Sequence, residues 1–321
     1  MIPEAVLTRW DLPSTIEELG FGKINDTYKV GDNVIVQRIN PKVFVNPIDV
    51  VANYRQVFPY ICDLVPDIVQ TKDGQDSVVD ADGSVWRVFP YYGSRSFRQL
   101  PDSLCQIAGE SYGQFLKRLK DCHVELRPSI PGFHRLDSYI EKLNEQRRSG
   151  VQLGECVYVD QVLDGIQDVS VSAQVIHGDC KIGNLLFDPL RPRVLKIVDL
   201  DTVMYGSPSW DFGDLVRSSI SGMKFDSDDD ARLRARVHEL CRGFFGAYGP
   251  RDQSAVTRFA SAPAYMSFML GVRYLTDHLA GDVYFKVDRP GANLLRARQQ
   301  FSLHRLFTRL HDKLAEFIVS I

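Results

Sequence analysis

The stretch from Val175 to Asn184, VIHGDCKIGN, ends a β-branched run in polar groups at fixed spacing. Asp179 lies two residues after His177, and Asn184 lies five residues after Asp179. A carboxylate held at the end of a strand can orient a hydroxyl group and accept its proton. An amide oxygen later on the same loop can reach a metal ion. These residue types suit phosphoryl transfer, in which alignment and charge neutralisation do most of the work.

The spacing His-x-Asp-x-x-x-x-Asn also occurs in the catalytic loops of kinases. By that pattern Asp179 is predicted to be the catalytic base and Asn184 a metal ligand. Lys181 is predicted to lie against the transferred phosphate and stabilise its negative charge. His177 is expected to brace the loop through hydrogen bonds. A pattern this short also arises by chance in polar loops, so its weight depends on the residues that follow it.

A second acidic element, VLKIVDLDTVMYG, places Asp199 fifteen residues after Asn184 and Asp201 two residues further on. Residues i and i+2 of a strand point to the same side, so both carboxylates are predicted to bind Mg²⁺ on the phosphates of ATP. A lone Asp at a strand end is more often a cap or turn residue. Asp211, in SPSWDFGDLVRS, is assigned that structural role: it is expected to cap a helix and anchor the catalytic loop.

Nearer the N-terminus, LGFGKINDTY carries Gly20 and Gly22, which allow a hairpin to lie close over phosphates. Lys23 is predicted to point either at a phosphate or at solvent. Kinases also place a Lys or Arg on the third strand to hold the phosphates, and VIVQRIN offers Gln37 and Arg38 there. Arg38 is predicted to bind the nucleotide through its planar fork. If the strand register instead turns Gln37 inward, Arg38 faces water.

The elements around these residues change character near residue 91. Residues 1–91 contain short β-branched runs separated by Asp-Gly turns, with one helical segment between them. Later residues contain three short strand-like runs and mostly helical periodicity. The helices are expected at 101–125, 135–148, 158–168, 228–248, 252–280 and 291–319. The predicted fold is α+β, with a small β-rich N-lobe (1–91) and a large, mainly helical C-lobe (92–321).

The composition excludes several other classes of protein. The net charge of −3 provides no basic field for nucleic acid or an anionic membrane. None of the six cysteines forms a Cys-x-x-Cys pair, which fits free thiols in a reducing cytosol. The start, MIPEAVLTRW, lacks the features of a signal peptide, and no run approaches the roughly 20 apolar residues of a membrane span. We expect a cytoplasmic protein that acts on a small molecule, with its oligomeric state left open.

The catalytic loop, the Asp-x-Asp strand and the glycine hairpin together resemble the aminoglycoside phosphotransferase and choline kinase superfamily. Members are small-molecule kinases with a protein-kinase-like two-lobed fold. A closer resemblance is to the N-acetylhexosamine 1-kinases. It rests on GKINDTYKV, VQRINPKVF, PGFHRLDSYI, HGDCKIGNLLFD, IVDLDTVMYGSPSWDFGDLVR and YMSFMLGVRYLTDHLAGDVYFKV. This resemblance implies phosphorylation of the anomeric hydroxyl of N-acetylglucosamine or N-acetylgalactosamine, with ATP and magnesium.

The resemblance also implies roles for single residues. In addition to the base and the metal ligands already named, Arg273 and Tyr284 are expected to contact the sugar. The adenine of ATP is expected between the lobes, near Phe89 and Tyr91. An alternative for Arg273 is an i, i+4 ion pair with Asp277 on a helix surface.

Two alternatives for function remain open at this point. The acceptor of a kinase with these motifs could instead be choline, homoserine, methylthioribose or an aminoglycoside. An aminoglycoside would need an acidic pocket, and Asp226 and Asp228 to Asp230 offer either that or a solvated helix start. The second alternative is a nucleotide-binding pseudokinase, because the third strand has no Lys. The presence of Asp179, Asn184 and Asp199 argues against a pseudokinase.

Overall fold

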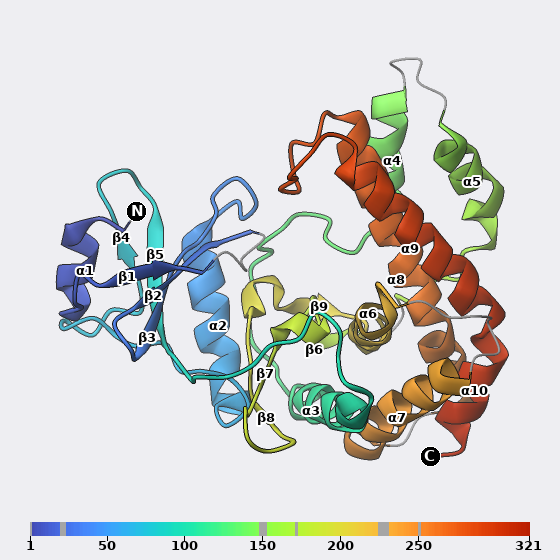
Figure 1. Cartoon of the computed structure of the whole chain (residues 1–321), viewed down its shortest axis with the longest axis horizontal. Coiled ribbons are helices and arrows are strands. Elements are labelled where there is room, and N and C mark those ends of the chain that lie inside the picture. Colours follow the sequence, from blue (N-terminus) through green and yellow to red (C-terminus); the bar gives the residue numbers. More distant parts are fainter. Residues whose placement is uncertain (1, 20–23, 148–152, 171–172, 224–230, 250–251) are drawn as a thin grey trace.

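The computed structural model describes residues 2–19, 24–147, 153–170, 173–223, 231–249 and 252–321. The elements form a small lobe built on an antiparallel sheet and a large helical lobe, as the sequence predicts (Figure 1). The described small-lobe elements are α1 (Glu4–Trp10), β1 (Ile16–Glu18), β2 (Asp26–Val30), β3 (Val34–Arg38), α2 (Pro47–Ile61), β4 (Val78–Val79) and β5 (Val85–Pro90). The strand order is β1-β2-β3-β5-β4, with every neighbouring pair antiparallel.

The two faces of this sheet have different environments. Val36 and Trp86 belong to an apolar cluster that includes Val6 and Trp10 of α1, so this face is covered by the N-terminal helix. Side chains alternate along a strand, so residues next to these in sequence project from the opposite face. That second face lies on the side of α2 and the large lobe (Figure 1). Residues that the sheet contributes to the cleft between the lobes must therefore come from the second face.

Two local predictions for the small lobe are wrong. The first helix, α1, was not expected, because an isolated helix of 7 residues has little stability of its own. Its apolar side chains Val6, Leu7 and Trp10 are buried against the sheet, and this packing stabilises it. Residues 67–71 are one of the short β-branched runs read as strands, but they form no regular strand, and the backbone N–H of Val69 bonds singly to the carbonyl of Val88.

The large lobe contains the remaining described helices and two small hairpins. The α-helices are α3 (Cys105–Arg118), α4 (Leu136–Arg147), α5 (Gly154–Val162), α6 (Pro208–Ile220), α7 (Ala231–Tyr248), α8 (Gln253–Leu279), α9 (Ala292–Arg309) and α10 (His311–Val319). The 3₁₀ turns are η1 (Asp102–Leu104), η2 (Leu163–Gly165), η3 (Ile182–Asn184) and η4 (Leu200–Thr202). Strand β6 (Gln174–Ile176) pairs with β9 (Met204–Gly206), and β7 (Leu185–Phe187) pairs with β8 (Val194–Ile197), both antiparallel.

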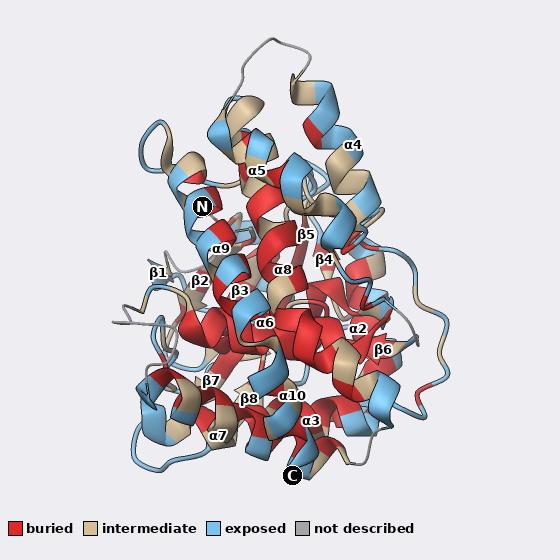
Figure 2. Cartoon of the chain, turned by 90° about the vertical axis from the view of Figure 1, so that its right-hand side faces the viewer, coloured by how far each residue is buried: buried red, intermediate tan, exposed pale blue. Residues whose placement is uncertain are grey.

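Helix α6 forms the centre of the large lobe, and the sequence did not predict its extent. All 13 of its residues are buried, and Figure 2 shows it as an uninterrupted buried helix among the others. A helix covered on every side has no polar face, so the periodicity that reveals surface helices is missing. The segment expected as one helix at 291–319 divides instead into α9 and α10 at Leu310. Within the described ranges, we find no helix with the length and apolar character needed to cross a bilayer.

Candidate active site

The catalytic loop leaves β6 at His177 and is held from several sides. The carboxylate of Asp211, in the first turn of α6, accepts the backbone N–H groups of His177 at 2.8 Å and Gly178 at 2.9 Å. The His177 ring donates from Nε2 to the carbonyl of Val198 at 3.0 Å and accepts the backbone N–H of Asp179 at Nδ1 at 3.2 Å. Both ring nitrogens are engaged within the protein. His177 therefore lies in the bracing position expected of it, and Asp211 anchors the loop without being the cap of α6.

Gly178 lets the loop lie directly against η4, the turn that follows Asp199. Its φ of +80° is in the left-handed region that favours glycine, and an added Cβ would lie 2.6 Å from the carbonyl oxygen of Thr202. The Thr202 hydroxyl in turn donates to the carbonyl of His177 at 3.0 Å. This close approach fixes the distance between the loop and the turn that carries Asp199.

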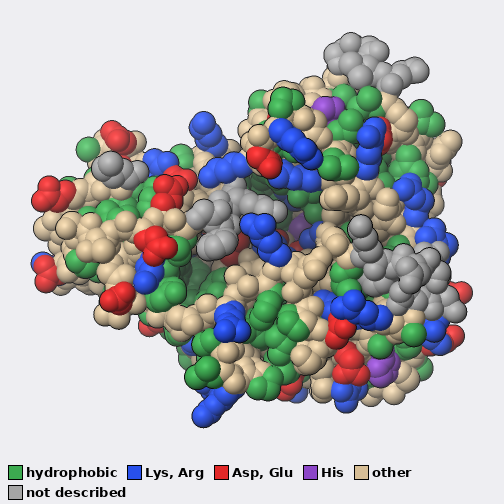
Figure 3. Space-filling model, viewed as in Figure 1, with side chains coloured by type: hydrophobic (Ala, Val, Ile, Leu, Met, Phe, Trp, Pro, Cys, Tyr) green, Lys and Arg blue, Asp and Glu red, His purple; other side chains and the backbone are tan. Residues whose placement is uncertain are grey.

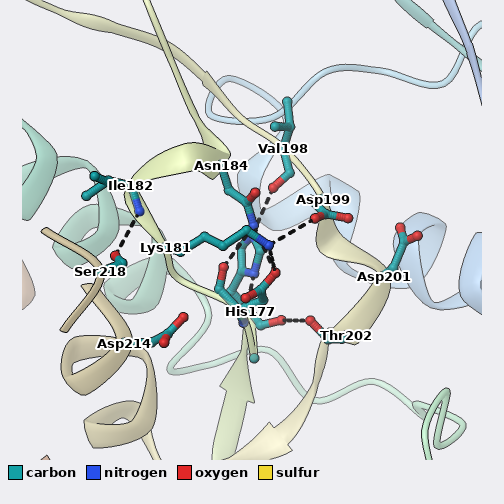
Figure 4. A network of polar contacts seen from close by, with 12 residues as sticks. His177, Lys181, Ile182, Asn184, Val198, Asp199, Asp201, Thr202, Asp214 and Ser218 are labelled. Atoms are coloured by element: carbon teal, nitrogen blue, oxygen red, sulfur yellow. Dashed lines mark hydrogen bonds and ion pairs between the residues drawn. The ribbon is translucent and has the colours of Figure 1, made fainter. Parts of the chain in front are cut away.

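The side chains of Lys181, Asn184 and Asp199 converge at one place (Figure 4), and hydrogen bonds join Asp179 to Lys181 and Asn184. Lys181 Nζ bonds to Asp179 Oδ2 and lies 3.6 Å from Asp199 Oδ2. Asn184 donates from Nδ2 to the carbonyl oxygen of Asp179 at 2.9 Å and to its carboxylate at 3.3 Å. Two carboxylates, one ammonium and one amide thus share a single small volume, although they come from segments fifteen residues apart.

The charged groups in this volume shift one another's pKa values. Burial raises the pKa of Asp179, but the ammonium of Lys181 outweighs that effect and holds it below its ordinary value. Burial opposes the charge on Lys181, yet Asp179 and Asp199 together raise its pKa. Burial raises the pKa of Asp199, and Lys181 only partly offsets this. Asp179 is therefore the carboxylate that stays ionised most readily.

The donor atoms suit a hard divalent cation carried by a nucleotide. With Nδ2 of Asn184 directed at Asp179, its Oδ1 remains as an oxygen ligand, and Asp199 adds a carboxylate. In the described ranges no three His, Cys, Asp or Glu side chains form a complete cage for a metal. Mg²⁺ is commonly held by one or two carboxylates plus substrate phosphates, without such a cage. The residues present fit that kind of site.

Asp201 does not join this group, so the expectation that it faces the same side as Asp199 is wrong, and its predicted role as a metal ligand has no support from this geometry. The prediction assumed strand alternation, but Asp199 has a φ of +69° and residues 200–202 form the 3₁₀ turn η4. The turn directs Asp201 away from the cluster, as Figure 4 shows. Its two carboxylate oxygens accept hydrogen bonds from Arg87 Nη2 at 2.5 Å and Asn25 Nδ2 at 2.6 Å, both in the small lobe.

Arg38 does not reach the cleft either. The register pairs Arg38 with Trp86, which places it on the sheet face covered by α1. There Arg38 Nε donates to Asp26 at 2.9 Å, with 44% of its side chain exposed. Gln37 points inward instead, as the alternative register predicted. The prediction that Arg38 binds the nucleotide is therefore incorrect for this arrangement.

The inward-facing cation of the sheet is Arg87, which the sequence analysis missed. Gln37 and Arg87 are direct cross-strand partners, and Gln37 Oε1 accepts from Arg87 Nη2 at 2.9 Å and Nε at 3.2 Å. The signal was present in VWRVFP, where a single Arg interrupts an apolar strand. A charged residue in such a run has to find a buried partner, because an isolated buried charge is costly.

The remaining predicted nucleotide contacts have mixed outcomes. Phe89 lies on the same sheet face as Arg87, with its ring centroid 5.0 Å from the guanidinium carbon. Tyr91 follows the end of β5; its backbone N–H bonds to the carbonyl of Asn33 at 2.7 Å, and the residue is exposed. Gly20, Gly22, Lys23, Asp226 and Asp228 to Asp230 lie outside the described residues.

Arg273 lies in a cage of aromatic rings on the C-lobe side of the cluster. Its guanidinium carbon is 5.2 Å from the ring centroids of Phe133 and Tyr139, 5.4 Å from that of Phe285 and 5.8 Å from that of Tyr284. Burial opposes its charge, but nearby phenol groups and the carboxylate of Asp179 raise its pKa. The predicted sugar contacts Arg273 and Tyr284 are therefore neighbours.

Asp277 shapes this region without pairing with Arg273. Its carboxylate accepts the backbone N–H groups of Tyr284 at 2.7 Å and Phe285 at 2.9 Å, and Asn293 Nδ2 at 2.8 Å. The alternative of an Arg273–Asp277 ion pair is thus excluded by the partners that Asp277 has. Asp277 fixes the loop after α8, which extends toward the small lobe (Figure 1).

His134 connects the aromatic cage to the catalytic loop, and the sequence analysis gave it no role. It adopts a φ of +62°, uncommon for a residue other than glycine. Its Nε2 donates to the carbonyl oxygen of Gly178 at 2.6 Å, and burial lowers its pKa to about 4, so the ring is neutral near pH 7. Phe133, the preceding residue, contacts Arg273. The positions of the cage and of Asp179 are thereby linked.

The surface around the cleft is suited to an anionic ligand. Figure 3 shows Lys and Arg side chains gathered around the hollow between the two lobes, whereas Asp and Glu side chains are prominent on the outer part of the small lobe. Such an arrangement attracts negatively charged molecules to the cleft even though the net charge of the chain is −3.

The fold and this cluster define a phosphotransferase. Residues 15–248 match the phosphotransferase enzyme family known as APH. The chain therefore belongs to this family, whose members include kinases for small molecules.

Solved structures of similar fold cover nearly the whole chain. A choline/ethanolamine kinase family protein from Mesorhizobium loti has 19% identity and a TM-score of 0.65, over 97% of this chain and 94% of its own. A microcompartment-associated aminopropanol kinase has 18% identity and a TM-score of 0.68, over 98% and 97%. An amicoumacin kinase solved with AMP-PNP and Ca²⁺ has 14% identity and a TM-score of 0.62, over 97% and 92%. These likenesses confirm the predicted two-lobed kinase-like fold.

The anchoring role of Asp211 leads to a prediction about stability. Burial raises the pKa of Asp211 to about 6, although the N–H groups that it accepts oppose this shift. Asp211→Ala leaves the N–H groups of His177 and Gly178 buried without an acceptor, at about 1–3 kcal/mol each. We expect a loss of about 2–6 kcal/mol in the free energy of unfolding, measured by urea denaturation. Unchanged stability would show that the carboxylate does not hold the loop.

Proposed function

We propose that this phosphotransferase transfers the γ-phosphate of ATP to the anomeric hydroxyl of an N-acetylhexosamine, giving the sugar 1-phosphate and ADP. The observation that carries the proposal is the caged guanidinium of Arg273 beside the catalytic loop. The acceptor side of the site thus presents a fixed cation and several aromatic rings close to Asp179.

Each residue of the cluster has one task in this reaction. Asp179 orients the sugar hydroxyl and takes its proton as the sugar oxygen bonds to the γ-phosphorus and the bond to the bridging oxygen of ADP breaks. Lys181 moves from the carboxylates to the phosphoryl oxygens and stabilises their charge. Asn184 and Asp199 hold a divalent cation, Mg²⁺ in our proposal. When bound, the cation offsets the charge of the phosphates.

The nucleotide is placed in the cleft between the lobes. Phe89 offers an aromatic surface on the cleft face of the sheet, and Tyr91 lies at the end of the same strand, so both are proposed to contact the adenine. The basic surroundings of the cleft support the binding of a triphosphate. The nucleotides present in structures of similar fold, such as AMP-PNP in the amicoumacin kinase, support the binding of a nucleotide.

The charge of Arg273 favours a neutral acceptor over a cationic one. Choline and amino alcohols carry a positive charge, and aminoglycosides carry several. A cation bound beside Asp179 would meet the guanidinium in a poorly solvated environment, where like charges repel strongly. An N-acetylated sugar has lost its amine charge, and its carbonyl and hydroxyl oxygens can accept hydrogen bonds from an Arg. Aromatic rings such as Tyr284 pack against the apolar face of a sugar.

The proposal is tested with a panel of acceptors. The protein is incubated with ATP, Mg²⁺ and either N-acetylglucosamine, N-acetylgalactosamine, choline, 1-amino-2-propanol, homoserine, methylthioribose or kanamycin, and ADP release is followed. We expect rapid turnover with the N-acetylhexosamines alone. Turnover with a cationic acceptor would overturn the sugar assignment. ATP binding without turnover on any acceptor would support the pseudokinase alternative.

The role of Arg273 is tested by Arg273→Met, which retains most of the side-chain volume. Hydrogen bonds from a charged group to a ligand contribute about 1.5–3 kcal/mol, so the KM for the sugar should rise about 10- to 100-fold. The KM for ATP should change little. Arg305→Met is the matched control, because Arg305 also stacks on a ring, that of Tyr158 at 4.8 Å, but from α9. Equal effects of both variants on the sugar KM would contradict a contact between Arg273 and the acceptor.

A further inference from the structure

The two lobes are joined by a buried polar network that centres on Asp201. Arg87 of β5 and Asn25, just before β2, both donate to its carboxylate, at 2.5 Å and 2.6 Å. The side chain of Arg87 is 1% exposed and that of Asp201 2%. A charged pair in such an environment holds the two segments that carry it in place, because breaking it leaves an uncompensated buried charge.

The small-lobe side of the network is held firmly. Gln37 Oε1 accepts two N–H groups of Arg87, and Gln37 Nε2 donates to the hydroxyl of Thr27 at 3.3 Å. Asn25 Oδ1 accepts the backbone N–H of Asn40 at 3.0 Å. The groups that reach Asp201 are therefore fixed to three neighbouring segments of the small lobe. Movement of the sheet is transmitted directly to Asp201.

On the large-lobe side, the network ends at the turn that carries Asp199. Asp199 precedes η4, has a φ of +69° and is not a glycine. Backbone in this conformation persists only where its surroundings hold it there, and the cost is about 1–3 kcal/mol. Asp201 lies in η4 itself and accepts hydrogen bonds from Arg87 and Asn25 of the small lobe. These two hydrogen bonds to Asp201 therefore restrain the turn that carries Asp199.

We infer that Arg87 is a positioning residue for the metal site, acting through Asp201 on Asp199. Arg87 is the cation on the inner face of the sheet, where the third strand presents Gln37 and turns Arg38 to the opposite face. In this role Arg87 acts through Asp201 rather than by contacting the reacting groups. The inference rests on the proposed function, specifically on Asp199 as a ligand of the divalent cation.

The test measures metal affinity directly, apart from activity. Mn²⁺ is titrated into the full-length protein saturated with ADP, and bound Mn²⁺ is followed by electron paramagnetic resonance. Loss of the residues that orient a ligand commonly weakens metal affinity about 10- to 100-fold. We expect Arg87→Met and Asp201→Asn each to weaken Mn²⁺ binding by about that factor. The affinity for ADP without metal, measured by calorimetry, should change less than about threefold.

A matched control separates positioning from general loss of stability. Arg236 is also a fully buried Arg, with 0% of its side chain exposed, and it pairs with Asp102 far along the large lobe, between α7 and η1. Arg236→Met should lower the Tm but leave the Mn²⁺ affinity within about twofold of the wild type. The double variant Arg87→Met/Asp201→Leu removes both charges, a replacement that often preserves stability. We expect this variant to fold, and we expect its Mn²⁺ binding to remain weaker than that of the wild type.

Three results would overturn the inference. The first is wild-type Mn²⁺ affinity in folded Arg87→Met or in the double variant, because the pair would then be only a cross-link between lobes. The second is an equal loss of ADP affinity with and without metal, because Arg87 would then act on the nucleotide. The third is unchanged Mn²⁺ affinity in Asp199→Asn, which identifies a failure of the proposed metal role itself and removes the basis of the inference.

Discussion

Asp179→Asn is expected to lower kcat by about 10³-fold while the Kd for ATP changes less than about twofold. The substitution retains the shape of the side chain and its place between Lys181 and Asn184, but an amide cannot accept the proton of the acceptor hydroxyl. General bases commonly contribute about 10²- to 10⁴-fold, which sets the size of the effect. Steady-state kinetics with N-acetylglucosamine and calorimetric titration of ATP measure the two quantities separately.

A control for this prediction is Asp188→Asn. Asp188 is a carboxylate of the same lobe, whose side chain accepts the backbone N–H of Leu190 and the side chain of Arg193 near the β7–β8 hairpin. It has no place in the cluster, so its loss should leave kcat within about twofold of the wild type. If Asp179→Asn retained most of its rate, another group would have to take the proton, and our assignment of the base would be wrong.

Asp199→Asn is expected to have the second-largest effect. The change removes the carboxylate that faces Lys181 Nζ at 3.6 Å and leaves Asn184 without its charged partner at the proposed metal site. Stabilisation of phosphoryl charge by a bound metal is worth several kcal/mol, so we expect kcat to fall by about 10²- to 10³-fold. The concentration of Mg²⁺ needed for half-maximal rate should also rise, because a neutral amide is a weaker ligand than a carboxylate.

The Mg²⁺ dependence distinguishes the metal role from a structural one. A variant that had merely lost stability would show a lower Tm and an unchanged Mg²⁺ requirement. If Asp199→Asn needed the same Mg²⁺ concentration as the wild type for half-maximal rate, whatever its kcat, the assignment of Asp199 as a ligand would be contradicted. Asp201→Asn should give a smaller effect in the same experiment, since Asp201 bonds to Arg87 and Asn25 rather than facing the cluster.

The sequence predicted the part of the site that depends on local spacing. Asp179, Lys181 and Asn184 lie on one short loop, so their separation along the chain largely determines their separation in space. The distant Asp199 was also placed correctly beside them, because it ends an apolar strand at a position typical of a second metal-binding element. Arg273 and Tyr284 came from the resemblance to a family, since nothing in a helical sequence pattern alone indicates an aromatic cage.

The errors arose where conformation departs from a regular period. Asp201 was predicted from strand alternation, which the left-handed φ of Asp199 and the 3₁₀ turn η4 abolish. The sheet faces on which Arg38 and Arg87 lie depend on the register of β3 with β5. Sequence periodicity cannot fix this register for a strand with polar residues on both faces. The extent of helix α6 was not predicted for a different reason: the helix is buried on every side and so shows no amphipathic period.

The most direct measurement of the central claim is phosphorus NMR of the product formed from ATP, Mg²⁺ and N-acetylglucosamine. We expect the loss of the γ-phosphate signal and the appearance of a phosphomonoester coupled to the anomeric proton of the sugar, with no such product from Asp179→Asn. A phosphomonoester at another hydroxyl would contradict the proposed acceptor position. No phosphorylated sugar, with phosphocholine formed instead under the same conditions, would contradict the neutral acceptor inferred from Arg273.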